Sequence, residues 1–260
     1  MRILKELRRI GIKAAKDAGK FLKDNFGQGK LTKSKSRFDY LSDADLQSER
    51  IIIDILKETS FSIISEEAGY IKGEESYKWL VDPLDGTLNY VNSIPFFSIS
   101  IALLHRNGPV LAIVYDPLRK EMYIADNIGC YLNGERIFIS NRKSYKKWLV
   151  GFGTSYSERE TALNYYSSIF SLTPKIRRFG AGSLTLAYVA SGRLDGAVLV
   201  FKDGNKNPWD YVPGCFLVEA AGGEVTNVKG EDWKTLRNSI IAGSEFFNKK
   251  IRKLLFNSRS

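Results

Sequence analysis

Acidic residues of this chain gather where its apolar segments end. They are Glu66 and Glu67 after Phe61–Ser65, Asp82 and Asp85 after Trp79–Val81, Asp210 after Trp209, and Asp39, Asp43 and Asp45 at the start of a helix. A carboxylate at the end of a buried strand is costly unless it is protonated, paired or bound to a cation. Several carboxylates that converge repel one another, so the pattern indicates a metal. The chain has one histidine, His105, and two cysteines, so oxygen ligands favour Mg²⁺ or Mn²⁺ over zinc.

The run from Asp82 to Thr87 has the composition of a metal and phosphate turn. Its two carboxylates, three residues apart, can hold neighbouring cations, and the carbonyl of Leu84 between them is a further hard ligand. Gly86 lets the backbone approach a ligand, and the amides of Gly86 and Thr87 can contact phosphate oxygens. The hydroxyl of Thr87 can orient a water. Taken alone, the run is equally typical of a proline-stiffened turn before a helix; the other acidic segments favour the functional interpretation.

Phosphomonoester hydrolysis is the chemistry that such a site suits. The dianionic ester repels hydroxide, and cations both neutralise it and lower the pKa of a bound water. Two ions about 4 Å apart can stabilise the entering and leaving oxygens of an in-line displacement. This reaction needs no protein nucleophile, which agrees with the scarcity of histidine and cysteine in the chain.

The elements that must position these residues alternate irregularly between helix and strand. Apolar residues from Ile3 to Leu22 recur at helical spacing, and Ser42 or Asp43 can cap a second helix that carries Asp45 in its first turn. The polar stretch Lys30–Arg37 between them is predicted to be a mobile loop. Further predicted strands are 61–65, 79–81, 97–104, 110–115, 121–125, 148–152, 176–179, 196–201, 224–227 and 239–242, and further helices are 158–170, 184–191, 211–221 and 245–255. Asn133-Gly134 predicts a hairpin. This order favours a layered α+β fold over a Rossmann sheet.

Composition narrows the class of protein further. The 43% hydrophobic and 26% charged content is typical of a folded globular chain. The net charge of +10 comes mostly from residues 1–37, which hold 12 basic and 3 acidic groups, a net of +9. A solvated helix face explains this segment better than a nucleic-acid or membrane contact. No run is long and apolar enough to span a membrane, and the N-terminus does not resemble a signal peptide, so we expect a cytoplasmic protein without membrane contact.

These motifs together resemble the inositol monophosphatase family, which belongs to the Mg²⁺-dependent, lithium-sensitive phosphatases and is related to the fructose-1,6-bisphosphatases. The family's first signature corresponds to Trp79–Thr87, and its second to Trp209-Asp210 followed by Gly222-Gly223. Glu66-Glu67 corresponds to its glutamate motif, and Asp39–Asp45 to its acidic segment. The order and spacing agree over nearly the whole chain. The resemblance implies an α/β/α/β/α sandwich of the sugar-phosphatase type.

The same resemblance implies roles for individual residues. Glu66, Asp82 and the Leu84 carbonyl would bind one Mg²⁺, and Asp82, Asp85 and Asp210 a second. A third, weaker ion would lie near Glu66, and Asp45 with Thr87 would polarise the attacking water. The substrate contacts it implies are Gly86, Thr87, Gly182, Ser183 and Asp203, together with a loop lysine for which Lys33 and Lys35 compete and Lys35 is chosen.

The resemblance also bears on organisation and leaves the substrate open. It implies one phosphatase unit over 1–260, in which 1–145 carry most metal ligands and 146–260 carry the substrate loops and Asp210, and it implies a homodimer. A small phosphate ester is the expected partner. Inositol monophosphate and fructose 1,6-bisphosphate are favoured; 3′-phosphoadenosine and NADP phosphatase activities are alternatives. In a different class, a catalytically silent nucleic-acid or regulatory protein on the same fold is supported only by the basic N-terminal segment.

Overall fold

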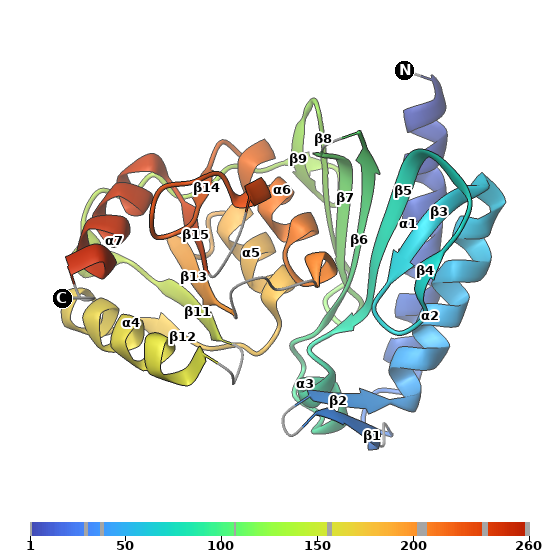
Figure 1. Ribbon diagram of the computed structural model, residues 1–260, viewed down its shortest axis with the longest axis horizontal. Coiled ribbons are helices and arrows are strands. Elements are labelled where there is room, and N and C mark those ends of the chain that lie inside the picture. The colour runs from blue at the N-terminus through green and yellow to red at the C-terminus, as the bar shows by residue number, and fades with distance from the viewer. Residues whose placement is uncertain are drawn as a thin grey trace.

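The computed structural model describes residues 2–28, 31–36, 39–106, 108–154, 158–201, 207–235 and 239–257. Two β-sheets and three layers of helices alternate along its longest axis (Figure 1). The arrangement is therefore the α/β/α/β/α sandwich that the family resemblance implies.

The first sheet is the larger one and has the strand order β10-β9-β8-β7-β6-β5-β3-β4. All neighbouring strands are antiparallel except β3 and β5. The hairpin at Asn133-Gly134 is confirmed, because both residues have the positive φ that a type I′ turn requires (50° and 92°). The strands are β3 (Phe61–Ser65), β4 (Gly69–Ile71), β5 (Glu74–Asp85), β6 (Ser98–His105), β7 (Gly108–Asp116), β8 (Glu121–Asp126), β9 (Gly129–Leu132) and β10 (Glu135–Arg136).

The second sheet has the strand order β12-β11-β13-β15-β14. β11 is parallel to both of its neighbours, and β15 is antiparallel to both of its own. Its central strands β13 and β15 are buried at every residue, which is why they read as nearly continuous apolar runs. They are β11 (Val150–Thr154), β12 (Ile176–Arg177), β13 (Gly196–Val200), β14 (Glu224–Thr226) and β15 (Ser239–Gly243).

The character of each helix matches its layer. α1 (Arg2–Asp24) and α2 (Asp43–Leu56) are amphipathic and cover the outer face of the first sheet, and α4 (Arg159–Leu172) and α7 (Glu245–Asn257) cover the outer face of the second. α5 (Gly182–Ala190) and α6 (Val212–Ala220) are apolar nearly all round, because they lie between the two sheets. The remaining turns are α3 (Thr87–Val91) and the 3₁₀ helices η1 (Lys57–Thr59), η2 (Tyr145–Lys147), η4 (Pro208–Asp210) and η5 (Trp233–Thr235).

Three hydrophobic cores separate these layers. One joins α1 and α2 to the first sheet, a central one surrounds α5 and α6, and the third joins α4 and α7 to the second sheet. Trp79 and Trp148, both completely buried, anchor the first and third cores. The central core holds both cysteines, Cys130 and Cys215. Because the central layer packs against both sheets, it sets the distance between residues of the two halves.

The prediction of a loop at Lys30–Arg37 was wrong. Leu31–Ser36 forms strand β1, which pairs antiparallel with β2 (Asp39–Ser42) in a separate two-stranded sheet. Lysine and serine have low strand propensity, so local composition could not indicate this strand; the ladder to the residues before α2 stabilises it. Strand β4 and helix α3 were not predicted either.

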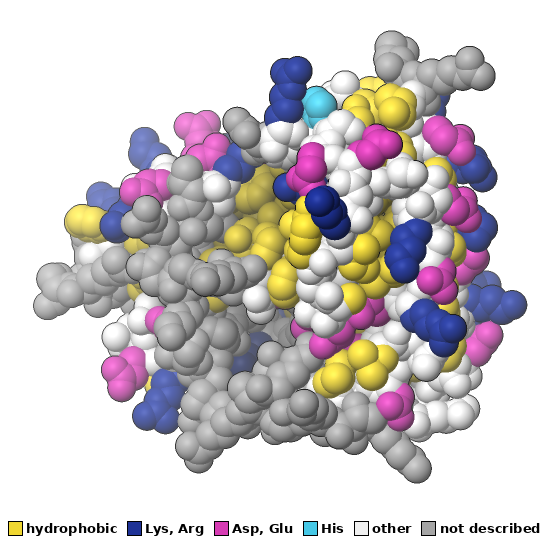
Figure 2. Space-filling view, turned by 45° about the vertical axis from the view of Figure 1, so that its right-hand side comes forward, with side chains coloured by type: hydrophobic (Ala, Val, Ile, Leu, Met, Phe, Trp, Pro, Cys, Tyr) yellow, Lys and Arg dark blue, Asp and Glu magenta, His cyan; other side chains and the backbone are white. Residues whose placement is uncertain are grey.

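The basic residues of α1 form its solvent face. Lys13 pairs with Asp17 at 3.0 Å and Arg9 with Glu6 at 2.7 Å, both within the helix, and Arg8 reaches Asp126 of β8 at 2.8 Å. On the right-hand side of Figure 2, positive and negative side chains are interspersed. Among the described residues, no helix has the length and apolar character needed to cross a membrane.

Candidate active site

Asp82 lies near the end of β5 and is almost completely buried, with 3% of its surface exposed. The sequence predicts a turn here, but β5 continues to Asp85, and its pairing with β6 is irregular between Asp82 and Asp85. The Leu84 amide donates to Oδ1 of Asp82 at 3.0 Å. The irregularity therefore lets two nearby carboxylates leave one strand toward the same end of the sheet.

Four carboxylates from three separate segments converge at this place, two of them from β5. Burial raises the pKa of Asp82 well above its ordinary value, and the neighbouring charges of Glu66, Asp85 and Asp210 raise it further. In a metal-free site this repulsion opposes folding. When a divalent cation is bound, each carboxylate becomes a ligand, and the clustered charges then stabilise the folded protein.

Asp85 connects the two halves of the molecule. Its Oδ1 accepts the Gly182 amide at 2.9 Å, and its Oδ2 accepts the Leu184 amide at 3.2 Å and the Ser98 hydroxyl at 3.4 Å. The two amides begin α5, so the carboxylate lies at the positive end of that helix. Burial raises the pKa of Asp85 to about 6, although these hydrogen bonds oppose the rise.

Asp210 is placed by the same helix. It ends η4, which packs against β5 and β6, and its carbonyl accepts the Ser183 hydroxyl at 3.2 Å. Ser183 is fully buried, so its hydroxyl holds the Asp210 backbone. Gly182 and Ser183 thus position two candidate metal ligands, and the substrate contact predicted for them stays a prediction.

Asp45 and Thr87 are hydrogen-bonded, as a water-activating pair requires. Thr87 Oγ1 donates to Asp45 Oδ1 at 2.8 Å and also lies 3.2 Å from the Leu84 carbonyl. The other oxygen of Asp45 accepts the Ser42 amide at 2.8 Å and the Ser42 hydroxyl at 2.5 Å. Ser42 is the N-cap of α2, and together with Asp45 it forms a capping box. One helix start therefore orients the carboxylate toward Thr87.

Gly86 is required at its position by conformation and by space. Its φ of 97° lies in the left-handed region, and a Cβ there would stand 3.1 Å from the Ala181 Cβ and 3.1 Å from the Phe96 carbonyl oxygen. This close approach brings the Asp85–Thr87 segment against the start of α5. Asn89 strengthens the contact, since its amide donates to the carbonyls of Phe96 and Phe179, both at 2.7 Å.

Glu49 is a site residue that the sequence analysis missed. It is 5% exposed, and its Oε1 accepts the Ser65 hydroxyl and the amides of Glu67 and Ala68, both amides at 3.0 Å. It thereby holds the turn that carries Glu66. Its position in the sequence could have indicated this role, because Glu49 follows Asp45 by four residues and so lies on the same face of the helix.

Two buried donors near the acidic cluster lack partners. The Ser100 hydroxyl on β6 and the indole nitrogen of Trp209, next to Asp210, have no hydrogen-bond partner in the part of the chain that the structure describes. Such orphaned groups are uncommon in protein interiors and suit a site whose acceptors are completed by a bound ligand. The oxygen ligands of the crowded carboxylates fit Mg²⁺, and the two unused donors could form hydrogen bonds with groups that surround the ion. Within the described ranges, however, no three His, Cys, Asp or Glu residues are already grouped as a metal site.

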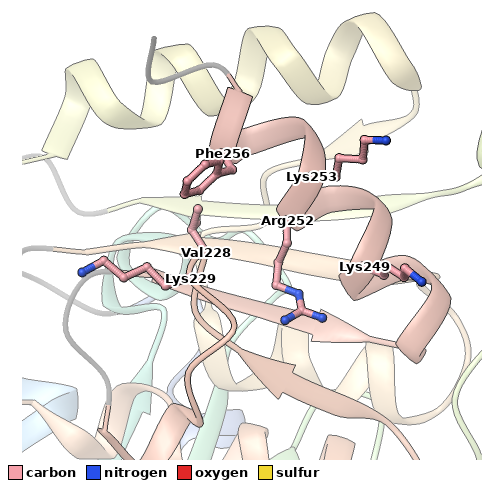
Figure 3. Close-up of a pocket in the computed structure, with 6 residues that line it drawn as sticks. All are labelled: Val228, Lys229, Lys249, Arg252, Lys253 and Phe256. Carbon is pink, nitrogen blue, oxygen red and sulfur yellow. The ribbon is translucent and has the colours of Figure 1, made fainter.

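The other predicted contacts cannot be placed. Asp203 lies outside the described residues. Lys35 belongs to strand β1, of which only the backbone is described. A cavity of about 240 Å³ lies elsewhere, between α7 and the turn after β14, lined by Val228, Lys229, Lys249, Arg252, Lys253 and Phe256. Lys229 and Lys249 point to opposite sides of it (Figure 3), so its cations do not converge on one ligand.

The layered fold and the acidic cluster together define a class of sugar-phosphatase-like proteins, and comparison with known proteins identifies the family. The inositol monophosphatase family model matches residues 3–259. An inositol-1-monophosphatase of Rhizobium meliloti is 35% identical over 255 residues, covering 95% of this chain and 94% of that protein. The chain belongs to the inositol monophosphatase family.

Other relatives carry a different name. The Nus factor SuhB of Escherichia coli K12 is 32% identical over 259 residues, covering 96% of this chain and 94% of that protein. The crystal structure of the extragenic suppressor protein SuhB from Bartonella henselae superposes with a TM-score of 0.89 at 32% identity, covering 96% of this chain and 98% of that one. The family supports phosphatase activity on a small phosphate ester and is generally Mg²⁺-dependent. The names leave the substrate open.

Proposed function

We propose that this protein is a Mg²⁺-dependent phosphomonoesterase that hydrolyses inositol monophosphate, fructose 1,6-bisphosphate or both. The observation that carries the proposal is the convergence of Glu66, Asp85 and Asp210 on the buried Asp82. A fold without a cation would gain nothing from four mutually repelling carboxylates. Their side chains and the Leu84 carbonyl would hold the ions, with Mn²⁺ as a substitute. When bound, Mg²⁺ neutralises the phosphate and acidifies a water.

The chain's own residues supply orientation and proton transfer. The single proton of the Thr87 hydroxyl is directed to Asp45 at 2.8 Å, so the lone pairs of Thr87 Oγ1 are free to accept a hydrogen from the attacking water. Thr87 can then take that proton while passing its own to Asp45, so that charge balances. The amides of Gly86 and Thr87, at the start of α3, are available to the phosphate oxygens. The homodimer and the lithium sensitivity that the family resemblance implies stay predictions.

Phosphate release tests the proposal directly. Inositol 1-phosphate, fructose 1,6-bisphosphate, 3′-phosphoadenosine 5′-phosphate and NADP are compared, each with Mg²⁺ and with EDTA. We expect Mg²⁺-dependent release, with kcat/KM ranking the substrates. Asp82→Asn and Asp210→Asn should abolish turnover and keep the fold by circular dichroism, whereas Asp54→Asn, on the exposed face of α2, should behave like the parent. Near-parental activity in either of the first two variants would overturn the metal assignment.

A binding role on the same fold is the second candidate, because several relatives are named Nus factors. It predicts no phosphate release from any of the four substrates at any temperature tested. Titration of the parent with RNA and DNA would then be the next measurement. Mg²⁺-dependent turnover would make the binding role unnecessary to explain the acidic cluster.

A further inference from the structure

Ser100 is a polar residue in a place where an apolar one would be expected. It lies in the middle of β6, it is completely buried, and its hydroxyl has no hydrogen-bond partner among the described residues. Its neighbours in the strand, Ile99 and Ile101, and Ala102 beyond them are equally buried. A buried hydroxyl without a partner costs free energy that a methyl group would not.

The register of the sheet places Ser100 beside the acidic cluster. β6 pairs with β5 so that Ser100 is directly opposite Asp82, and Ser98 is opposite Asp85 (strands labelled in Figure 1). Side chains two residues apart lie on the same face of a strand, so the side chains of Ser98 and Ser100 lie on the same face of the first sheet. Residues directly opposite in an antiparallel pair have Cβ atoms about 4.5–5.5 Å apart, within reach of a hydrogen bond between their side chains.

Ser98 already shows what such a serine does. Its hydroxyl donates to Oδ2 of the carboxylate opposite it, Asp85, at 3.4 Å. Asp82 has one carboxylate oxygen that could accept such a hydrogen bond. Its Oδ1 accepts the Leu84 amide at 3.0 Å, and no hydrogen bond to its Oδ2 is found among the described residues. The donor without an acceptor and the oxygen without a donor therefore lie opposite each other.

We propose that Ser100 is a positioning residue for the metal centre, whose hydroxyl donates to the Asp82 carboxylate when a divalent cation binds. The inference rests on the proposed function, because it requires that Asp82 is a metal ligand. A carboxylate that ligates a metal through one lone pair is itself oriented by hydrogen bonds to its others. Ser100 would fix the Asp82 rotamer from the β6 side, as Ser98 and the α5 amides fix Asp85. It touches neither the substrate nor the reacting atoms.

Stability with and without metal separates this role from a merely structural one. We would measure the melting temperature and the calorimetric Kd for Mg²⁺ in the parent, Ser100→Ala and Ser100→Thr. Without metal, Ser100→Ala should melt at or above the parental temperature, because the orphaned hydroxyl is gone. With Mg²⁺, its gain in melting temperature should be smaller, and its Kd should rise about 10-fold, the usual cost of losing such a partner. Ser100→Thr keeps the hydroxyl and should recover most of the affinity.

Ser239→Ala is the matched control, since Ser239 is a buried strand serine of the second sheet whose hydroxyl accepts the Val228 amide. It should lower the melting temperature equally with and without Mg²⁺ and leave the Kd unchanged. The role of Ser100 is overturned if Ser100→Ala has the parental Kd for Mg²⁺ and the parental rise in melting temperature on adding Mg²⁺. In that case, Mg²⁺-dependent phosphate release by the parent would still uphold the proposed function. A parent that neither binds Mg²⁺ nor releases phosphate overturns both.

Discussion

Replacing Gly86 by alanine should damage both stability and activity, for reasons that can be separated. The left-handed backbone of Gly86 costs an L-residue about 1–2 kcal/mol. The added Cβ would also stand 3.1 Å from a backbone oxygen of Phe96 and 3.1 Å from the Ala181 Cβ. The Phe96 oxygen cannot rotate away as a flexible side chain would, and such overpacking costs a further 1–3 kcal/mol, roughly. The expected loss in the free energy of unfolding is therefore about 2–5 kcal/mol.

Gly222 provides the matched control for this experiment. Its φ of 88° is similar, but no atom of the described residues lies within 4 Å of the position that its Cβ would take. Gly222→Ala should therefore lose only the backbone contribution, about 1–2 kcal/mol. The difference between the two variants measures the close packing of Gly86 against Phe96 and Ala181.

Urea unfolding followed by circular dichroism gives the two stabilities, and phosphate release per folded molecule gives the activities. Gly86→Ala should lose most of its kcat even where it is fully folded, because relief of the contact displaces Asp85 from the α5 amides. Gly222→Ala should keep the parental kcat. The reasoning is refuted if Gly86→Ala is no less stable than Gly222→Ala, or if it is less stable but equally active.

Three further predictions concern other parts of the site and core. Thr87→Ala should lower kcat by roughly 10²–10⁴-fold, as expected for a lost proton-transfer group, while Thr87→Ser keeps the hydroxyl and most of the rate; equal rates in both would remove Thr87 from the reaction. Glu49→Ala removes the acceptor of one hydroxyl and two amides. It should lower the free energy of unfolding in urea by about 3 kcal/mol or more, and Glu49→Gln should be intermediate. Parental stability of the alanine variant would contradict the role of Glu49 in the turn. Burial raises the pKa of the Cys130 thiol to about 12 and that of Cys215 well above its ordinary value, so neither thiolate should form at pH 8. Both thiols should react with a disulfide reagent only on unfolding, and rapid labelling of the native protein would contradict their placement in the central core.

Local patterns predicted much of the secondary structure. Apolar residues at helical spacing predicted α1, and Ser42 was correctly predicted as a possible cap of α2. The apolar run before Asp82 predicted the core of β5, although not its continuation to Asp85. These predictions succeeded because burial of one face imposes a period that is visible in the sequence itself.

The failures have a common physical cause. Strand β1 has a polar sequence and is stabilised by its ladder to β2, which no local preference reveals. Glu49 looks like any charged residue on a helix, because the sequence does not show that its carboxylate is buried under the Glu66 turn. In both cases the stabilising partner comes from another segment, and a propensity or a period cannot name that partner.

The sequence by itself determined the chemistry that this protein can support. Carboxylates in place of histidine and cysteine ligands, and the spacing of Asp82, Asp85 and Thr87, indicate hard cations and phosphate without reference to any fold. Only the tertiary structure decided that those carboxylates meet. Asp85 accepts hydrogen bonds from two amides of α5 that are 97 and 99 residues further along the chain. Ser100 is opposite Asp82 because of the register between β5 and β6. Pairing register and layer packing are set by the burial of whole faces, so they arise from the sum of many residues and cannot be read from any one motif.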